Sequence, residues 1–446
     1  MRFQGISSYN DVIFALASGA GRAAVAVLRL SGAGTGEAVR RLAGSLPPPR
    51  LASLKRLRHP GTGETLDRAL VLWFPAPRSY TGEDCAELHL HGGPAVIAGV
   101  ADALVAAGAR PAEPGEFTRR AFVHGKMDLT AAEGVADLIA AETAAQRRQA
   151  LHQAEGGLAG LYEGWTERLT GLLARQEAFI EFETEDLPPD LDAAVGRAAA
   201  ALRAEMEAHL ADGGRGERLR EGLVVAILGA PNAGKSSLLN ALVGRDAAIV
   251  SARAGTTRDV VEARLDLGGV PVTLADTAGL REAADEIEAE GVRRALLRAE
   301  SADLRLLVFA ADTPPDSETL ALVAPGALVV ANKTDLAPAP AAIGGVAPIP
   351  VSARTGDAGL AALREALAAA ARDLARPEGT APITRGRHRA AVRDAAARLA
   401  DLDGAGLPEL RAECLRAASA ALGRITGRVG VEAVLDAVFR EFCIGK

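Results

Sequence analysis

The fold of the second half of the chain is decided by residues 223–236, LVVAILGAPNAGKS. The apolar run Leu223–Leu228 is typical of a buried strand, and the residues after it match GxxxxGK[ST]. In such a loop the backbone amides point at phosphates, and the N-terminus of the following helix adds positive potential. Lys235 would supply a charge to the β- and γ-phosphates, and the Ser236 hydroxyl would coordinate Mg²⁺. A glycine-rich turn that matches by chance is the alternative, and the strand and helix expected around the loop argue against it.

Three further motifs follow in the order that a Ras-like nucleotide-binding fold requires. Asp276-Thr277-Ala278-Gly279 comes after an expected strand at 270–274, where a carboxylate can hold the magnesium shell and a glycine can meet the γ-phosphate. Asn332-Lys333-Thr334-Asp335 comes after an apolar strand at 327–331. Asp335 can accept two hydrogen bonds from guanine that adenine cannot donate. Ser352-Ala353-Arg354 could supply an amide to the guanine carbonyl. Each motif is weak alone, and together they predict a GTP site.

The residues that orient the attacking water are less clearly marked. Gly255-Thr256-Thr257-Arg258-Asp259 lies where a switch threonine binds Mg²⁺, and either threonine could do so. Ras-type GTPases place glutamine directly after DxxG, but this chain has Leu280. Another group must therefore orient water, and the candidates form an acidic run whose other reading is a solvated helix face: Glu282, Asp285, Glu286 and Glu288. Asn232 could help to hold a monovalent cation, or it could be an ordinary loop side chain.

Composition limits the class of protein. The 446 residues carry a formal net charge of −7, which argues against a non-specific nucleic-acid coat protein. The 3 cysteines, Cys85, Cys414 and Cys443, are scattered and show neither a metal knuckle nor a disulfide framework. We see neither a signal peptide nor an apolar stretch long enough to span a bilayer. We therefore expect a protein of the cytoplasm.

The periodicity of the chain changes along its length. Expected strands at 25–30, 69–74 and 87–91 and a helix at 95–107 indicate a mixed α/β region. Thr130-Ala131-Ala132-Glu133 reads as a capping box, and the helical pattern continues to Leu210. Strands and helices alternate from about 218 to 376, and helices then resume to the end. Apolar residues form a helical stripe there: Val431, Val434, Leu435, Val438, Phe439 and Phe442.

This organisation suggests an α/β module inserted between two helical stretches, which we expect to pack into one helical domain because their apolar stripes would otherwise face water. One basic cluster is a candidate patch for binding nucleic acid, although a solvated helix start is an equal alternative: Arg385, Arg387, His388 and Arg389.

At this point the chain resembles the MnmE (TrmE) family of bacterial tRNA-modification GTPases over essentially its whole length. Residues 232–240, 255–259 and 276–282 look like the GTPase domain of that family. More specific are 80–84 (YTGED) with 91–94 (HGGP), and 114–118 (PGEFT). The final residues 442–446, FCIGK, are the most diagnostic.

The resemblance implies a multidomain α+β and α/β protein. It would have an N-terminal tetrahydrofolate-binding-like domain that also dimerises (1–124), a helical domain (125–217 and 379–446) and an inserted Ras-like P-loop GTPase domain (218–378). The implied function is potassium-stimulated GTP hydrolysis that, with the flavoprotein partner MnmG (GidA), adds a carboxymethylaminomethyl or aminomethyl-type group at C5 of the tRNA wobble uridine. The implied one-carbon donor is 5-formyl- or 5,10-methylene-tetrahydrofolate.

The resemblance also assigns candidate site residues. Mg²⁺ would be held by Ser236 and Thr257, and potassium by Asn232, Ser251, Arg253 and Thr256; the family has threonine where this chain has Ser251. Catalysis would involve Glu288, Asn232, Thr257 and Arg258. Folate would bind Arg29, Glu87, Lys126 and Lys446, with a possible role for Cys443. The nucleotide would also contact the rest of the motifs: Ala233, Gly234, Lys235, Ser237, Ala252, Ala254, Gly255, Asp276, Thr277, Ala278, Gly279, Asn332, Lys333, Thr334, Asp335, Ser352, Ala353 and Arg354.

Two other functions remain as alternatives. A regulatory switch of the ribosome-assembly type would use hydrolysis only to time binding, but such proteins usually append a basic RNA-binding domain after the GTPase domain, and here helices follow. A folate-sensing scaffold, in which folate binds but is never consumed, is the weaker alternative.

Overall fold

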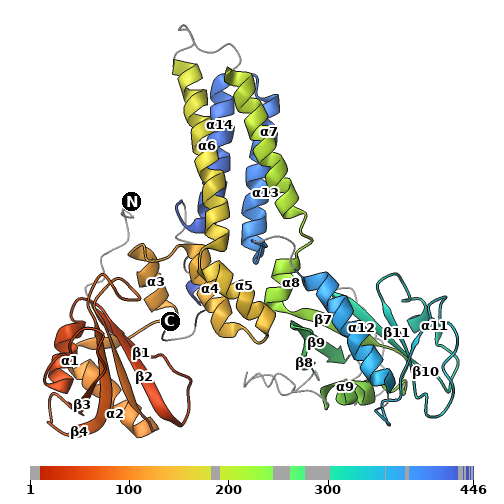
Figure 1. The fold of residues 1–446 in the computed structure, drawn as a ribbon, viewed down its shortest axis with the longest axis horizontal. Coiled ribbons are helices and arrows are strands. Elements are labelled where there is room, and N and C mark those ends of the chain that lie inside the picture. Colours follow the sequence, from red (N-terminus) through yellow and green to blue (C-terminus); the bar gives the residue numbers. More distant parts are fainter. Residues whose placement is uncertain are drawn as a thin grey trace, which may run out of the picture. The chain divides into compact units, whose positions relative to one another are not determined.

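The computed structural model describes residues 11–181, 191–244, 262–276, 302–356, 358–376 and 381–429, with 435, 438–440, 442 and 445 near the C-terminus. The chain divides into two compact units, drawn as ribbons in Figure 1. We call Met1–Ala136, Ala154–Tyr162 and Leu422–Lys446 the first unit, and Asp137–Gln153 and Glu163–Ala421 the second unit.

The first unit is built on a six-stranded sheet of strand order β3-β4-β5-β2-β1-β6. Neighbouring strands are antiparallel except β1 and β6, which are parallel. Apolar side chains of two helices, α1 and α2, join the core on this sheet. The elements are β1 Val12–Leu16, β2 Ala23–Ser31, α1 Thr35–Ala43, β3 Ser53–Arg58, β4 Thr65–Phe74, β5 Cys85–Gly92, α2 Pro94–Ala106 and β6 Ala109–Pro111. They include the three strands and the helix expected from the sequence.

The register of β2 and β5 sets two charged side chains opposite each other. Leu28, Leu30 and Leu88 are almost fully buried in the core of the sheet. Because side chains alternate along a strand, the residues between them point to the other face. On that face Arg29 is paired with Glu87 across the two strands. The alternation in the sequence therefore places this ion pair outside the apolar core.

Two helices and the C-terminal segment form a second core of the first unit. These are α3, Glu116–Val123, and α4, Leu129–Ala140, which extends past the limit of the unit. The C-terminal stripe expected from the sequence is buried here wherever the structure describes it, whereas Val431 and Val434 lie outside the described residues. The buried members of the cluster are Phe122, Leu129, Ala132, Leu435, Val438, Phe439 and Phe442.

The expected capping box at the start of α4 is wrong. The helix begins at Leu129, so Thr130 lies inside the first turn. The Asp128 carboxylate instead accepts hydrogen bonds from the amides of Thr130 (2.7 Å) and Ala131 (2.9 Å). A carboxylate before the first turn satisfies orphan amides as well as a hydroxyl does, and its charge also suits the helix N-terminus.

In the second unit, helices that come before the second sheet in the sequence pack with helices that come after it. Figure 1 shows α6, α7, α13 and α14 side by side. An Arg168–Glu205 ion pair of 2.6 Å joins α6 to α7, and the Gln176 amide donates to the Pro408 carbonyl of α14 at 3.4 Å. The helices are α5 Ala144–Ala154, α6 Gly157–Glu181, α7 Leu191–Leu210, α13 Gly386–Asp401 and α14 Pro408–Thr426, with a 3-10 turn at Leu402–Gly404.

The second sheet has the strand order β12-β11-β10-β7-β9-β8. Its neighbours are parallel except β8 and β9, which are antiparallel. Helices α9 and α12 join the core on one face, and a separate apolar cluster covers the other. The elements are α8 Arg215–Glu221, β7 Leu223–Leu228, α9 Lys235–Val243, β8 Glu262–Leu267, β9 Val270–Asp276, β10 Leu304–Ala310, α11 Ser317–Leu320, β11 Leu328–Asn332, β12 Ile349–Pro350 and α12 Ala358–Ala375. The strands expected at 223–228, 270–274 and 327–331 are present as β7, β9 and β11, and β8 was not expected.

The chain enters and leaves this sheet region at one place. A Cβ on Gly216 of α8 would come within 2.3 Å of the Ile383 carbonyl oxygen, so only glycine allows this close approach. The Arg220 Nε donates to the Thr384 carbonyl at 2.9 Å. The helix that leads into the sheet therefore touches the segment that returns from it.

Residues of the basic cluster at the start of α13 are paired or buried near this junction. The Arg385 guanidinium pairs with Asp137 at 2.8 Å, and Arg389 pairs with Asp212 at 2.6 Å. His388 is fully buried. Arg385 and Arg389 are therefore engaged in ion pairs within the second unit and His388 is buried, so these three side chains do not form an exposed nucleic-acid patch.

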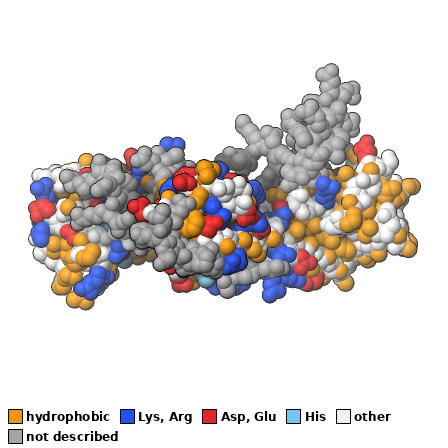
Figure 2. Space-filling view, turned by 90° about the horizontal axis from the view of Figure 1, so that it is seen from above, with side chains coloured by type: hydrophobic (Ala, Val, Ile, Leu, Met, Phe, Trp, Pro, Cys, Tyr) orange, Lys and Arg blue, Asp and Glu red, His pale blue; other side chains and the backbone are white. Residues whose placement is uncertain are grey.

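Charge is distributed evenly over the surface in view. On the face drawn in Figure 2, cationic and anionic side chains lie interspersed among apolar ones. None of the helices in the described ranges is long and apolar enough to cross a bilayer. Among these same residues, no group of three or more His, Cys, Asp or Glu side chains is placed to hold a metal ion. The acidic net charge is therefore not gathered over one part of the face shown.

Candidate functional site

The loop between β7 and α9 has the backbone of a phosphate-binding loop. Gly229, Asn232 and Gly234 have positive φ angles of 156°, 64° and 89°. A Cβ on Gly229 would lie 2.2 Å from the Val308 carbonyl oxygen, and one on Gly234 would lie 2.3 Å from the Asn332 side-chain nitrogen. Asparagine is among the few other residues that tolerate this left-handed region. The glycines of the motif are thus required by close packing as well as by φ.

Lys235 is positioned by its own loop. It is the first residue of α9 and is only 7% exposed. Its Nζ donates to the carbonyl oxygens of Gly229 (2.7 Å) and Ala230 (2.9 Å). Ser236 and Ser237 follow it on the exposed side of the helix. The ammonium group is therefore held over the loop, at the end of the helix that attracts anions.

Asn332 joins the guanine-recognition motif to the phosphate loop. It is the last residue of β11 and is 1% exposed. Its amide nitrogen donates to the Ala233 carbonyl at 2.9 Å, and its amide oxygen accepts from the Ala353 N–H at 3.2 Å. Three of the motifs found in the sequence therefore meet at one side chain. The Ala353 amide, one of those that the Ser352-Ala353-Arg354 motif could supply to the guanine carbonyl, is bonded to Asn332 in this structure.

Asp335 is held in place by the last motif. One carboxylate oxygen accepts from the Ser352 hydroxyl at 2.7 Å, and the other lies 3.9 Å from the exposed Arg354 guanidinium. The Thr334 amide donates to the Val351 carbonyl at 3.2 Å. The two loops after β11 and β12 are thus fixed to each other, with a carboxylate between them that could read a base.

A small hollow of about 70 Å³ lies between the phosphate loop and the segment that follows β10, and the loop after β11 contributes Lys333 to it. Lys333, with a left-handed φ of 64°, forms part of its wall and pairs with Asp312 at 3.3 Å. The side of the hollow next to the phosphate loop is lined by Ala230, Pro231, Asn232 and Ala233. The loop and the base-reading motif therefore share one surface.

The DxxG motif is positioned through its strand. In the register of β7 and β9, Asp276 lies beside Ile227, close to the start of the phosphate loop. The carboxyl ends of parallel strands meet at one edge, which is where ligands bind in open α/β sheets. The side chain of Asp276 is outside the described part, as are these candidates: Ser251, Ala252, Arg253, Ala254, Gly255, Thr256, Thr257, Arg258, Thr277, Ala278, Gly279 and Glu288.

A separate pocket of about 310 Å³ lies in the first unit. Its lining includes Arg29 and Glu87, which are joined by a 3.0 Å ion pair across β2 and β5. The Arg29 guanidinium also lies 5.1 Å from the centre of the Tyr80 ring, and burial raises the pKa of the Tyr80 hydroxyl. The pocket volume is within the roughly 300–1,000 Å³ common for ligand sites. An aromatic ring, an arginine and a carboxylate therefore converge on it.

The donors of this pocket fit a folate. The Arg29 Nη1 atom is buried and has no hydrogen-bond partner among the described residues, which is costly unless a ligand supplies an acceptor. Lys126, the third folate candidate, donates to the Pro77 carbonyl at 3.1 Å, one residue from the pocket lining. Lys446 and Cys443 lie outside the described residues.

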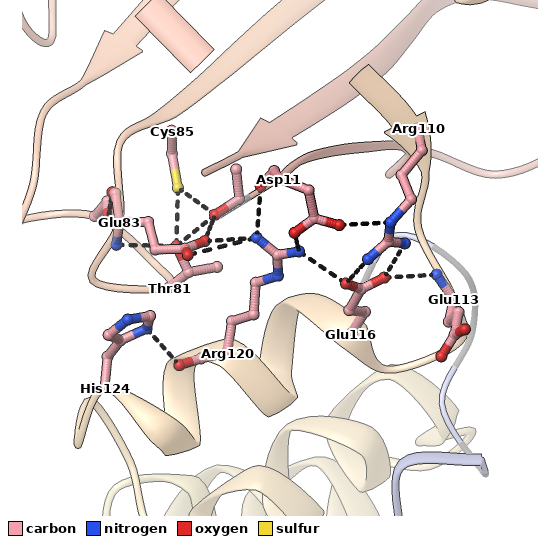
Figure 3. Close-up of polar contacts among 11 residues, drawn as sticks. Asp11, Thr81, Glu83, Cys85, Arg110, Glu113, Glu116, Arg120 and His124 are labelled. Carbon is pink, nitrogen blue, oxygen red and sulfur yellow. Dashed lines mark hydrogen bonds and ion pairs between the residues drawn. The ribbon is translucent and has the colours of Figure 1, made fainter. Parts of the chain in front are cut away.

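The first unit also contains a buried ion network that the sequence analysis missed (Figure 3). Arg120 is fully buried and donates to Asp11 at 2.8 Å, Glu116 at 2.9 Å and Glu83 at 3.2 Å. Arg110 also bonds Asp11 and Glu116, each at 2.6 Å. The i, i+4 spacing of Glu116 and Arg120 on α3 was a signal in the sequence, but the contacts to β1 and to the loop before β5 were not.

The network keeps its carboxylates charged. Burial by itself would raise the pKa of Glu116, but hydrogen bonds from Arg110 and Arg120 hold that pKa below its usual range. Burial likewise opposes ionisation of Asp11, and the same two arginines lower its pKa. Both groups are therefore ionised at neutral pH, and the ion pairs are fully formed.

Hydrogen bonds carry this network to the pocket wall. The Ser31 hydroxyl donates to Glu83 at 2.7 Å and lies 2.7 Å from the Thr81 hydroxyl. The Thr81 oxygen in turn lies 3.2 Å from the Cys85 sulfur, and Cys85 lines the pocket. The segments 80–84 and 114–118 are thus connected through Glu83, Arg120 and Glu116, none of which is in the pocket lining.

Comparison with known proteins agrees across both units. The family described as "GTP-binding protein TrmE N-terminus" matches residues 12–126, and the "MnmE helical domain" family matches residues 129–443. A relative from Gluconacetobacter diazotrophicus, "tRNA modification GTPase MnmE", is 62% identical over 437 residues, covering 97% of this chain and 98% of its own. A relative of the same name from Granulibacter bethesdensis is 57% identical, covering 98% of this chain and 100% of its own.

Two solved structures resemble part of the chain. The FeoB G-domain from Methanococcus jannaschii is 25% identical and covers 34% of this chain and 98% of that one, with a TM-score of 0.26. The G domain of the T. maritima FeoB iron transporter is 27% identical and covers 33% and 98%, also with a TM-score of 0.26. These scores are low, so kinship rests on the full-length sequence relatives.

Proposed function

Because the chain belongs to the MnmE (TrmE) family of tRNA-modification GTPases, we propose that it couples potassium-stimulated GTP hydrolysis to modification of C5 of the wobble uridine in certain tRNAs. It is a GTPase that acts in tRNA modification. The added group would be of the carboxymethylaminomethyl or aminomethyl type, made with the flavoprotein MnmG from a folate one-carbon unit. Since tRNA is the substrate, we place the protein in the cytoplasm, as a dimer through its N-terminal domain.

The observation that carries this proposal is the double hydrogen bond of Asn332, to Ala233 and from Ala353. It ties the phosphate loop to the base-reading loops, so a nucleotide that fits one end must fit the other. In our proposal Lys235 binds the β- and γ-phosphates, and Asp335 accepts the guanine N1–H and amino protons. Asp335 is oriented for this by Ser352, whose hydroxyl occupies only one of its oxygens.

Two cations would complete the hydrolytic site. Ser236 and Thr257 would hold Mg²⁺, and Asn232, Ser251, Arg253 and Thr256 would hold potassium. Of the potassium group the structure describes Asn232, whose exposed amide sits on the left-handed residue of the phosphate loop, as a ligand-facing group should. Bound there, the cations neutralise negative charge on the phosphates. Glu288 would orient the attacking water, and Arg258 beside Thr257 would assist.

The folate part of the proposal rests on the pocket of the first unit. We propose that Glu87 accepts hydrogen bonds from the pterin, as a carboxylate can from paired N–H donors. Arg29, through its unpartnered Nη1, and Lys126 with Lys446 would bind the remaining polar groups and the glutamyl tail. The one-carbon unit is the chemistry that the folate supplies when bound.

One reconstitution tests hydrolysis and coupling together. The Asp335→Asn variant keeps the shape of the side chain but presents an amide N–H₂ where the carboxylate accepted hydrogen bonds from guanine. Its GTP affinity should therefore fall by about 100-fold or more, and it should bind xanthosine triphosphate instead. Nucleosides from tRNA incubated with MnmG, folate, K⁺ and either nucleotide would be measured. Wild type should modify the wobble uridine only with GTP, and the variant only with xanthosine triphosphate.

The control is Asp102→Asn, an exposed aspartate on α2 that should change nothing. Equal modification in Na⁺ and in K⁺ would refute the potassium assignment. Modification that proceeds normally when no nucleotide binds would favour the switch alternative, in which GTP hydrolysis has no part in the tRNA chemistry.

A further inference from the structure

The folate pocket has two different ends. Tyr80 and Cys85 lie toward the buried end with the Arg29–Glu87 pair, whereas Arg50 and Arg78 line the pocket but are exposed to solvent. The buried end has a donor and an acceptor for a ring system. The exposed end adds two more guanidinium groups.

Arg50 is held in an unusual conformation at this end. Its φ angle is 64°, in the left-handed region that is unfavourable for a side chain with a Cβ. Its guanidinium lies 5.6 Å from the centre of the Phe74 ring and donates to the Arg78 carbonyl oxygen. The ring and the carbonyl therefore fix the side chain beside Arg78 rather than leave it to extend into water.

The charge of this end is not balanced. Neither Arg50 nor Arg78 makes an ion pair with a carboxylate among the described residues. Glu87 is the only carboxylate among the lining residues, and it is already paired with Arg29. Lys126 lies next to Arg78 through its hydrogen bond to Pro77. In a chain with a formal net charge of −7, such a group of cations is a site for an anion.

We propose that the cationic rim, defined as Arg50, Arg78 and Lys126, binds the additional carboxylates of folates that carry a chain of several glutamates. This rests on the proposed folate site and extends it. A single-glutamate folate bound with its ring at Glu87 would end near the rim, and each further glutamate would place another carboxylate among the guanidinium groups. Arg–carboxylate pairs are charge-assisted and favour this class of ligand over neutral tails.

The test is a titration of the purified full chain with 5-formyl-tetrahydrofolates that carry one, three or five glutamates, followed calorimetrically. We expect the Kd to fall by about tenfold from one glutamate to three, with little further gain, because exposed ion pairs are individually weak. The gain should shrink as salt is raised, while the single-glutamate Kd changes less.

Variants locate the effect. Arg78→Ala and Arg50→Asn should lose most of the gain with tail length, measured for each variant as the ratio of its own single-glutamate Kd to its three-glutamate Kd; asparagine is chosen because it tolerates the left-handed backbone. Arg56→Ala, an exposed arginine on β3 of the same sheet, is the matched control and should keep the full gain.

The possible outcomes distinguish failure of the proposed folate site from failure of the inference about the cationic rim. Absence of binding by any folate would remove the proposed function of the pocket and this inference with it. Binding of the single-glutamate folate with no dependence on tail length would leave the proposed function standing and overturn the inference. If Arg78→Ala weakened tRNA binding while the dependence on tail length persisted, the rim would belong to RNA phosphates, and the inference would again be overturned.

Discussion

At the residue scale, the nucleotide site of the second unit depends on side chains that connect its loops, Asn332 first among them. Asn332 spans from the phosphate loop to the loop after β12, and its own position at the end of β11 is fixed by the sheet. A buried amide with two specific partners acts as a brace. It transmits the geometry of one loop to the other.

Asn332→Ala should therefore weaken GTP and GDP binding without altering base preference. The change leaves a carbonyl and an amide unpaired, which costs about 1–3 kcal/mol, or about 5- to 150-fold in affinity. Fluorescent-nucleotide titration measures this. Asn240→Ala, on the exposed side of α9, is the control. A variant that bound adenosine nucleotides as well as guanosine ones would show that Asn332 reads the base directly.

Arg120 has a comparable role in the first unit. Arg120→Met keeps the length of the side chain but leaves Glu116 and Glu83, which are largely buried, without their shared partner. Removing one member of a buried ion pair costs about 3–5 kcal/mol of unfolding free energy. Urea unfolding of the first unit measures the loss, and Arg56→Met should leave stability within about 0.5 kcal/mol of wild type. An equal loss in both variants would mean that the network is not specifically stabilising.

The sequence could predict a site residue when its partners lie in the same short motif, but not when they lie far away along the chain. The phosphate loop, Asn332 and Asp335 belong to contiguous motifs, so their types and order were enough to place them together. Arg120 bonds Asp11, which is 109 residues away, and no local pattern records that contact. Arg385 and Arg389 looked like surface charge for the same reason, since their carboxylate partners, Asp137 and Asp212, lie far away along the chain.

At the element scale, strands were predicted best where both faces are buried. β7 was expected at Leu223–Leu228 and is found there, because a strand in the middle of a parallel sheet is apolar throughout. β8 was missed, since this edge strand, Glu262–Leu267, mixes charged and apolar residues. The start of α4 was misplaced because Asp128 and Thr130 are both good caps, and only the backbone decides between them.

The pH dependence of the helical bundle is set in part by α7. His209 lies edge-on to Trp165, with ring centres 5.4 Å apart, and burial lowers its pKa. The native state thus takes up the proton less readily than the unfolded chain. The contribution of neutral His209 to the free energy of unfolding is fully present above the unfolded pKa of about 6.5. It is lost as the pH falls below that value, toward the lower native pKa.

We therefore expect the urea midpoint of the wild type to decrease as the pH is lowered from 7.5 to 5.5. Trp165 fluorescence would monitor the unfolding. His209→Phe removes the titrating group and should flatten this dependence. His152→Phe, at an exposed position on α5, should retain the wild-type slope. If the His209 variant kept the full slope, the acid sensitivity would come from other groups, such as the carboxylates of the second unit.

At the scale of the whole molecule, each unit has its own core and, in the function proposed above, its own ligand. The chain contains 2 tryptophans, and they report on different units. Trp73 on β4 is 8% exposed in the first unit, and Trp165 on α6 is 4% exposed in the second. Trp165→Phe and Trp73→Phe variants would therefore make fluorescence specific for one unit at a time.

Ligands should stabilise the units selectively. GDP with Mg²⁺ at 100 times its Kd should add about 2.7 kcal/mol to the transition seen by Trp165 and leave that seen by Trp73 unchanged. Folate should do the reverse. Denaturant unfolding of the two single-tryptophan proteins measures both. Equal shifts at both probes with either ligand would show that the chain unfolds as one cooperative body.

The junction at Gly216 and Ile383 has a consequence for how such a chain could arise. Because α8 touches the returning segment, the ends of the inserted sheet region are neighbours, joined further by the bond from Arg220 to Thr384. A few residues could bridge that gap. The nucleotide-binding part is therefore a module that an ancestral helical protein could gain, exchange or lose without a change in the path of the helices on either side.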